Sequence, residues 1–495
     1  MMLMVDTTIT SVALPSIQRE LGATASQLAW VQNAYLLAVA ALMPFAGSFG
    51  DRYGRKRVFV AGLVLFTVGS AASGLAPDIA WLIAARTLQG SGAAVVSALG
   101  LSILAASFGV EHLERPLGIW AASTSLGVAA GPLLGGILVA AVDWRAIYTI
   151  NIPIGIATAL VMAALVPESR SDRRTTVDAF GATLLAGALL SVVAGLHALT
   201  LGTTDYSPVH SLVPLALAVV LTAAFVARER RAHDPVMPLS LFRPRAFRAA
   251  VVVSVVVNFA LMGSMYFQSL VLQNLRGWTP LSTGLLLLPL NIALAISGLR
   301  AASVIKRFGN DVVAAGGLAL AALGLAVLVP LGFVTGPALV IVIGAGGALL
   351  GLGLGSAFPS ISAAGIRQVD LGEMGVASAT LGDARQVGST LGIAALVAVM
   401  IAVSTSTWTR LGDDLGLPST SLSAVQNDVL VGSAPAVAGR LGAEAAAAAS
   451  RSFAVGVAVA YVLAFLLVAV AAVYARRSLR PSPAPDPASS PAGGG

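Results

Sequence analysis

The stretch GSFGDRYGRKR, residues 47–57, gathers charge in a chain that has little of it. Charged residues make up 10% of the 495-residue chain, but here they take five of the last seven positions: Asp51, Arg52, Arg55, Lys56 and Arg57. Three glycines are interspersed with them: Gly47, Gly50 and Gly54. Such a stretch can hold phosphate, bind nucleic acid or connect two membrane helices. The surrounding sequence indicates which of these three roles applies.

Long apolar runs occur along most of the chain, which is 57% hydrophobic with a mean hydropathy of +0.89. A run of about 18 to 25 apolar residues can cross the roughly 30 Å hydrocarbon core as a helix, which satisfies its own backbone polar groups there. We therefore expect an all-α polytopic membrane protein. The predicted spans number fourteen: 2–18, 29–49, 58–76, 80–104, 117–141, 147–167, 178–200, 210–228, 248–272, 282–304, 312–332, 338–363, 376–403 and 452–475.

The basic residues predict the orientation of these spans. If the N-terminus is cytoplasmic, 20 of the 29 Lys and Arg residues fall in cytoplasmic segments and six in external loops. This bias follows the positive-inside rule. An even number of spans then places both termini in the cytoplasm, and the Ala-, Gly-, Val- and Arg-rich composition indicates the cytoplasmic membrane of a bacterium. The Pro-, Ser- and Gly-rich tail 481–495 is predicted to be disordered.

Span counting makes residues 47–57 a short cytoplasmic connection between spans 2 and 3. A phosphate-binding glycine loop must instead follow a strand and open a soluble helix, and so short a connection offers nucleic acid little surface. The chain has no cysteine and four histidines without metal-ligand spacing. We find no clustered groups for catalysis, so we expect no enzyme activity, metal, cofactor or nucleic acid.

A weak internal repeat suggests how the spans are organised. KRFGND, residues 306–311, echoes DRYGRK between spans 10 and 11. The echo predicts a 6+2+6 layout, as in transporters built from duplicated six-helix halves. The expected parts are an N-terminal bundle 1–177, two inserted spans with a linker 178–247, and a C-terminal bundle 248–480 with an external loop at about 404–451.

Two charges fall inside predicted spans. Asp6 and Arg86 lie about 18 and 12 Å from the outer ends of spans 1 and 4, and intramembrane charges are functional candidates. Their depths permit coupling, direct or through water. A capping role for Asp6 and an Arg86 that reaches the outer interface stay open. Because residues 1–17 give only about 25 Å, span 1 is either marginal or begins upstream of Met1.

The fifth span contains GVAAGPLLGG at residues 127–136. Glycines four residues apart let a neighbouring helix approach closely, and a proline inside a helix removes a backbone hydrogen bond. Close packing alone explains GxxxG, but the full pattern is much rarer. It consists of Gly127, Gly131, Pro132, Gly135 and Gly136.

Together these stretches resemble the major facilitator superfamily, and specifically its fourteen-helix drug:proton antiporter branch. GSFGDRYGRKR is similar to the loop 2–3 signature, RTLQGSGAA (86–94) to the fourth-helix motif, GVAAGPLLGG to the fifth-helix antiporter motif and DTTITSVALPSI (6–17) to the first-helix motif. Three further stretches resemble others in that branch: WRAIYTINIPIG (144–155), YFQSLVLQNLRGWTPLSTGLLLLP (266–289) and ARQVGSTLG (384–392).

The resemblance implies a major facilitator fold and roles for particular residues. Asp6 would carry protons or contact a cationic substrate, assisted by Arg86. Asp51 and Arg55 would form a cytoplasmic latch, with Asp51 set against the positive N-terminal end of the helix near 376. Gly47, Gly50 and Gly54 would allow the tight packing of a movable latch. A simple positive-inside anchor stays the alternative.

Other polar residues in the spans are candidates for the substrate cavity or for interhelical hydrogen bonds: Asn33, Tyr35, Asn258, Tyr266, Gln268 and Asn291. Asp383, where the branch more often has an uncharged residue, is either a second titratable site or a structural partner of Arg385 or a neighbouring helix. The sequence thus predicts a proton-driven exporter of small amphiphilic compounds such as drugs, antibiotics or dyes, working by alternating access. A proton-coupled importer is the alternative, and we expect no obligate protein partner.

Overall fold

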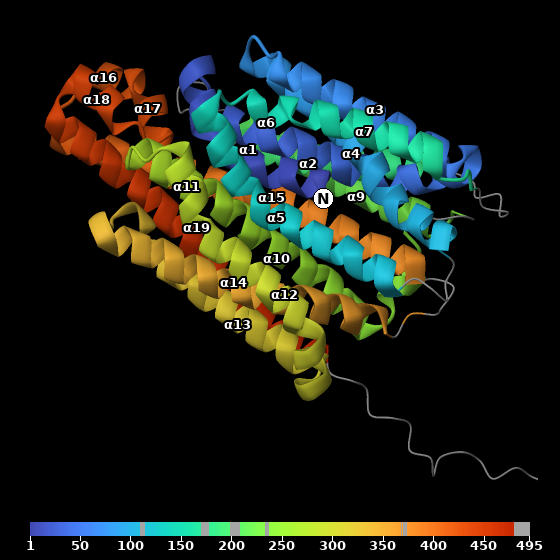
Figure 1. The fold of residues 1–495 in the computed structure, drawn as a ribbon. Helices are drawn as coiled ribbons and strands as arrows, with labels where there is room; N and C mark the ends of the chain where they lie inside the picture. Colours follow the sequence, from blue (N-terminus) through green and yellow to red (C-terminus); the bar gives the residue numbers. More distant parts are fainter. Residues whose placement is uncertain are drawn as a thin grey trace, which may run out of the picture.

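The computed structural model describes residues 1–108, 114–169, 178–198, 208–232, 237–367, 369 and 374–479. Every regular element in these ranges is a helix, and they contain no strand (Figure 1). The predicted all-α class is therefore confirmed. The tail 481–495 lies outside the described residues.

In the first group of helices, α2 and α3 pack on α4, α7 packs on α3, and α1 packs on α5; we call this group the first bundle. Helix α2 begins with a capping box in which Thr24 and Gln27 each accept from the other's backbone N–H. It bends by 52° between Met43 and Phe45, on either side of a proline, which lacks a backbone N–H. The members are α1 (Met2–Leu21), α2 (Ala25–Tyr53), α3 (Arg55–Gly74), α4 (Ile79–Phe108), α5 (Glu114–Ala141), α6 (Ala146–Thr149) and α7 (Asn151–Leu165).

A second group packs around α14 and α15, and we call it the second bundle. Several crossings rely on glycines, since a side chain at Gly317 or Gly353 would meet the backbone of the facing helix. The long members are α10 (Arg245–Leu270), α12 (Leu288–Phe308), α13 (Asn310–Leu328), α14 (Gly336–Ile366), α15 (Met374–Asp414) and α19 (Ala443–Ser478). Short helical elements precede or connect them: η2 (Leu239–Phe242), η3 (Val271–Leu275, a π-helix), α11 (Pro280–Leu286) and η4 (Val329–Gly332).

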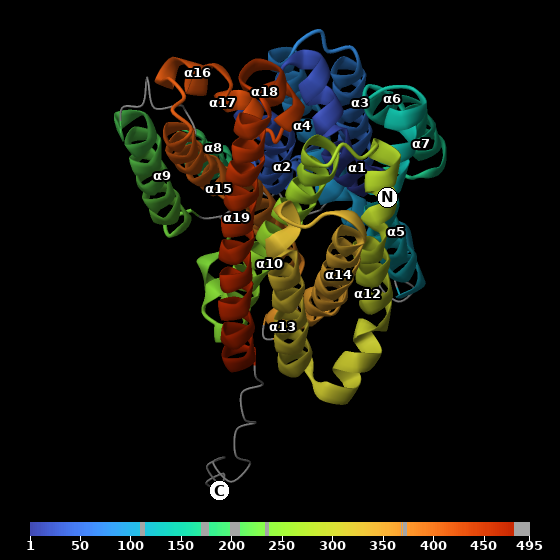
Figure 2. The ribbon, with the colours of Figure 1, turned by 90° about the vertical axis from the view of Figure 1, so that its left-hand side faces the viewer.

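Two further helices, α8 (Ala179–Ala198) and α9 (Pro208–Glu229), lie outside the bundles. Helix α8 packs on α2 and α15, one from each bundle, and α9 packs on α8. Figure 2 shows α9 at the edge of the molecule. This arrangement agrees with two helices inserted between six-helix halves, while the residue boundaries of the halves stay a prediction.

Most of the predicted external segment 404–451 is helical, and its place outside the membrane stays a prediction. Helix α15 continues to Asp414 and α19 begins at Ala443. Between them lie α16 (Ser419–Ala424), α17 (Gln426–Leu430) and α18 (Ala434–Leu441), which cover a small apolar core around the buried Trp408. We call α16–α18 the cap, its side of the molecule the cap end, and the opposite side, where α2 meets α3, the loop end.

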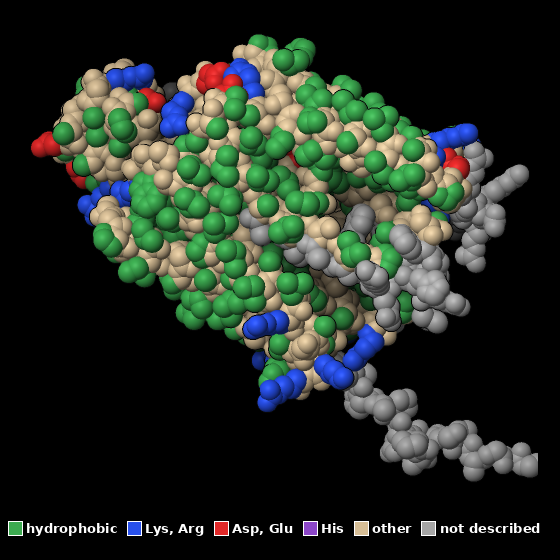
Figure 3. All heavy atoms as spheres, viewed as in Figure 1, with side chains coloured by type: hydrophobic (Ala, Val, Ile, Leu, Met, Phe, Trp, Pro, Cys, Tyr) green, Lys and Arg blue, Asp and Glu red, His purple; other side chains and the backbone are tan. Residues whose placement is uncertain are grey.

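Each of the fourteen predicted spans falls on a helix or a broken helix. Ten helices within the described residues are long and apolar enough to cross a membrane, or eleven if the bent α2 is one span. Apolar side chains cover the visible flank, while charged ones gather at its ends (Figure 3). The chain is thus a multi-pass membrane protein, and the number fourteen stays a prediction.

Candidate functional site

A buried ion pair lies inside the first bundle. The Nη1 atom of Arg86 in α4 lies 2.8 Å from Oδ2 of Asp6 in α1. Their side chains are 1% and 0% exposed. The two charges that the sequence placed only by depth are therefore in direct contact.

The Asp6 carboxylate is surrounded by hydrogen-bond donors. Its Oδ1 accepts from Gln89 Nε2 at 2.7 Å and from Asn151 Nδ2 at 2.8 Å. Both amides also donate to Ser70 Oγ, which itself donates to the backbone oxygen of Tyr148 at 2.9 Å. With Arg86, the Asp6 carboxylate thus has three donor side chains, two from α4 and one from α7.

The Arg86 guanidinium also has partners besides Asp6. Its Nε donates to the backbone oxygen of Val31 and its Nη1 to Gln89 Oε1 at 2.6 Å. The guanidinium carbon lies 4.2 Å from the centre of the Tyr35 ring and 5.4 Å from that of Tyr148, within the range of cation–π attraction. The network therefore joins α1, α2, α3, α4 and the α6–α7 segment through one carboxylate and one guanidinium.

The glycines of α5 allow close contact on two sides. A side chain at Gly131 would overlap Thr8, and one at Gly135 would meet Ile9, both in α1. Gly136 lies against the backbone of Pro280 in α11 of the second bundle. Helix α5 thus packs tightly on the helix that carries Asp6 and on the opposite bundle. Gly127, next to Met1 and Met4, and Pro132, next to Gly284 of α11, extend these two contacts.

In the stretch 47–57 the structure pairs two of the predicted latch residues. Arg55 Nη2 lies 2.7 Å from Asp51 Oδ1, and Arg55 Nε donates to the same oxygen. A side chain at Gly50 would overlap Leu99, whereas Gly47 has open space around it. Close packing therefore explains Gly50 but not Gly47. A contact of Asp51 with the start of α15 stays a prediction.

The six predicted cavity residues are not gathered in one place. Tyr35 belongs to the Arg86 site, and Tyr266 donates to the backbone oxygen of Ala25 in the opposite bundle. Asn33 lines a small cavity between α2, α8 and α15, and its Oδ1 has no hydrogen-bond partner within the described ranges. The remaining three donate to oxygens of their own helices one turn back: Asn258, Gln268 and Asn291.

Asp383 in α15 is 7% exposed, and its Oδ1 lacks a hydrogen-bond partner in the described part of the chain. No ion pair with Arg385 occurs there. Gln386, one turn further along α15, donates to the backbone oxygen of Leu36 at 3.5 Å, so this face of α15 meets α2. The local pairing with Arg385 that the sequence left open stays a prediction.

Four members of the Asp6 site were not singled out by sequence: Gln89, Asn151, Ser70 and Tyr148. All but Ser70 fall in quoted motifs, RTLQGSGAA and WRAIYTINIPIG. Their polarity inside apolar helices was the available signal. It did not separate them from ordinary interhelical hydrogen bonds, because spacing along a helix does not reveal which helix it faces.

Comparisons with known proteins agree with this architecture. Residues 1–393 match the family described as Major Facilitator Superfamily. The chain is 36% identical over 403 residues to the multidrug resistance protein Stp of Mycobacterium tuberculosis (strain CDC 1551 / Oshkosh), covering 81% of this chain and 74% of that protein. It is 33% identical over 414 residues to the tetracenomycin C resistance and export protein of Streptomyces glaucescens, covering 83% and 75%.

Solved structures show the same fold at low identity. A bacterial homolog of the human lysosomal transporter Spinster, in an inward-facing and unoccupied conformation, aligns with a TM-score of 0.67 and 17% identity. The alignment covers 98% of this chain and 96% of that one. From the family match and the identity to these relatives, the chain belongs to the Major Facilitator Superfamily.

Proposed function

We propose that the protein exports small amphiphilic compounds, such as drugs, antibiotics or dyes, in exchange for protons. The observation that carries the proposal is the Asp6–Arg86 pair, an ionisable pair at 0% and 1% exposure whose hydrogen bonds reach five parts of the first bundle. The names of the relatives, which include resistance and export proteins, support drug efflux.

In the proposed cycle, a proton from outside binds Asp6 and removes the charge that Arg86, Gln89 and Asn151 hold. Loss of these charge-assisted bonds frees α1 to move against α4 and α7. The two bundles then rock about the contact of α5 with α11, exposing the substrate site alternately to each side. The proton gradient supplies the energy, so the mechanism needs no nucleotide or other cofactor.

Asp383 is proposed as a second titratable site. It lies on the face of α15 that meets residues 36–43 of α2, whose sequence LLAVAALM contains no hydrogen-bond donor side chain. Its Oδ1 has no hydrogen-bond donor in the described part of the chain, and a buried charged oxygen without a donor is unfavourable. It therefore favours a bound proton or the cationic group of a substrate.

The remaining assignments follow the same scheme. Both termini and the loop end are placed in the cytoplasm, the cap outside, and the latch of Asp51 and Arg55 on the side where substrate enters. A proton-coupled importer on the same fold is the alternative. The glycine pattern of α5 and the names of the relatives favour export.

The test uses everted membrane vesicles from a strain that overproduces the protein. Wild-type vesicles with an imposed proton gradient should accumulate a fluorescent amphiphilic dye and lose it on addition of an uncoupler. Asp6→Asn should abolish the gradient-driven part, while Asp413→Asn, which changes an exposed carboxylate of α15, should not. Full proton-driven export by Asp6→Asn would refute the mechanism, and gradient-driven movement in the opposite direction would support the importer.

A further inference from the structure

The N-terminus of α3 is capped by residues that follow α7, the last helix of the first bundle. Helix α3 begins at Arg55, and no side chain of its own N-cap, Gly54, accepts from its first turn. Instead Lys56 N donates to Glu168 Oε1 at 3.0 Å, and Arg55 N donates to the backbone oxygen of Ser169 at 2.9 Å. Two of the free N–H groups of the first turn are thus satisfied by the segment that follows α7.

The same segment receives a contact in return. Lys56 Nζ donates to the backbone oxygen of Ala163 at 2.7 Å, in the last turn of α7. A carboxylate therefore lies at the positive N-terminal end of α3, and an ammonium group lies at the negative C-terminal end of α7. Both placements are favourable for the helix dipoles. We call these three hydrogen bonds the α3–α7 joint.

Gly54 is required for the joint on two counts. Its φ of +109° is a conformation that L side chains rarely adopt, and a Cβ there would lie 2.8 Å from the Glu168 carboxyl group. The glycine in the motif DRYGRKR therefore makes room for a carboxylate that lies 114 positions further along the chain.

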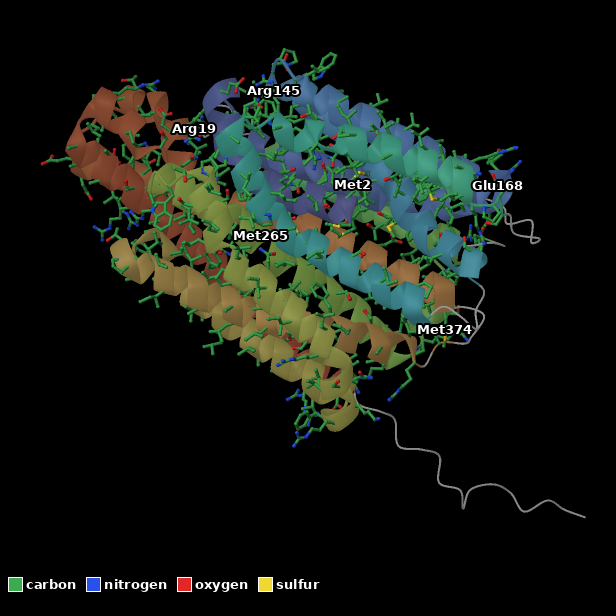
Figure 4. All side chains as sticks on the ribbon, viewed as in Figure 1. Met2, Arg19, Arg145, Glu168, Met265 and Met374 are labelled. Carbon is green, nitrogen blue, oxygen red and sulfur yellow. The ribbon has the colours of Figure 1, made fainter. Side chains whose placement is uncertain are left out.

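We propose that Glu168 is a positioning residue for the latch, fixing the 51–57 segment to the first bundle so that Asp51 and Arg55 move with it as one body. The inference rests on the proposed function only in that a latch is needed for alternating access. Arg55 connects the parts, because its backbone is held by Ser169 while its guanidinium holds Asp51. Figure 4 shows Glu168 and Met374, the first residue of α15, at the same end of the molecule.

The rigidity of this joint matters when the loop end is closed and not when the loop end is open. When the loop end closes, the latch must meet the second bundle in a fixed position, and a loose segment loses conformational entropy on docking. When the loop end is open, the segment has no partner to meet. Loss of Glu168 should therefore lower the ratio of closed to open loop ends.

The experiment measures that ratio directly, without substrate or proton gradient. Spin labels are attached to cysteines introduced at Ser107 on α4 and Arg307 on α12, both exposed near the loop end, in a chain that has no native cysteine. Glu168→Ala should lower the closed-to-open ratio about fivefold, the effect of removing a carboxylate from a helix N-terminus. Glu168→Gln keeps an acceptor for Lys56 N and should lose less. Amide exchange at Lys56 verifies that the joint is broken.

Ser169→Ala is the matched control, since only the backbone of Ser169 takes part in the joint, and it should leave the ratio unchanged. An unchanged ratio in Glu168→Ala, with or without a lower melting temperature, would reduce Glu168 to a folding contact and overturn the proposal. So would an equal shift in Ser169→Ala. Failure of the protein to export drugs would refute the proposed function but would leave these distances, and the inference, standing.

Discussion

Replacing Asp6 by asparagine tests the central site through stability as well as transport. The amide is the same size as the carboxylate, but it has one acceptor and one donor where Asp6 has two acceptors. Oδ1 receives Gln89 and Asn151, and Oδ2 receives Arg86. In either orientation an N–H₂ group therefore faces a donor, and the 1%-exposed Arg86 loses its counter-charge. Breaking a buried pair in this way costs about 3–5 kcal/mol.

A second substitution gives the reasoning its sharpest check. Asp6→Asn combined with Arg86→Gln removes the unpaired charge, so the double variant should recover at least half of the lost free energy of unfolding without recovering transport. Asp51→Asn, whose ion pair with Arg55 is partly exposed, should cost no more than about 1 kcal/mol. Unfolding in mixed SDS micelles, followed by tryptophan fluorescence, measures all three. An Asp6→Asn protein within 1 kcal/mol of wild type, or a double variant less stable than Asp6→Asn, would refute the argument.

Three further predictions concern packing, closure and pH. Gly131→Ala should lower stability by about 1–3 kcal/mol and slow export because its Cβ overlaps Thr8, while Gly344→Ala, which has open space, should do neither; melting temperature and vesicle transport check both. Gln273→Ala removes the 2.7 Å bond to the backbone oxygen of Val12 and should favour an open cap end at least fivefold, measured by spin labels across that end. The Arg145 hydrogen bond, aided by Trp144 and opposed by desolvation, holds the pKa of Glu20 below its usual value. Its stabilisation is thus present above the usual pKa and is lost as pH falls through the lowered one, so the melting-temperature difference between wild type and Glu20→Gln should vanish at low pH.

The helices could be predicted from sequence because hydropathy reports directly on the segments that lipid surrounds. It does not report where a helix ends. Residues 404–414 are rich in Ser, Thr and charged residues, so the sequence was interpreted as a loop, yet α15 continues through them. There the helix is held by the cap, where the indole of Trp408 donates to the backbone oxygen of Leu422.

The site was predictable in its charged members and not in its neutral ones. A charged side chain such as Asp6 or Arg86 has a high free-energy cost inside the membrane, so the sequence alone marks both as candidates. Depth, however, gives only their position along the membrane normal. Whether the two side chains meet depends on the rotation of α1 and α4 about their axes. Burying the neutral amides of Gln89 and Asn151 costs little free energy, so they look like ordinary interhelical contacts. Only their distances to Asp6 identify them as members of the site. Likewise nothing near Gly54 in the sequence points to Glu168 as the group it accommodates.

The contacts between the bundles bear on the order of events at Asp6. At the cap end, Gln273 of η3 donates to Val12 of α1, and Asn274 donates both to Gln18 of α1 and to the backbone of Val431 beside the cap. The cap end is thus held closed through α1 itself. Val12 lies six residues, about 9 Å, along α1 from Asp6. Any movement that opens the cap end must therefore pull on the helix that carries the carboxylate. Within the proposed exchange, the intact Asp6–Arg86 pair belongs to the cap-closed state after proton release, and opening toward the proton source is coupled mechanically to disturbing that pair.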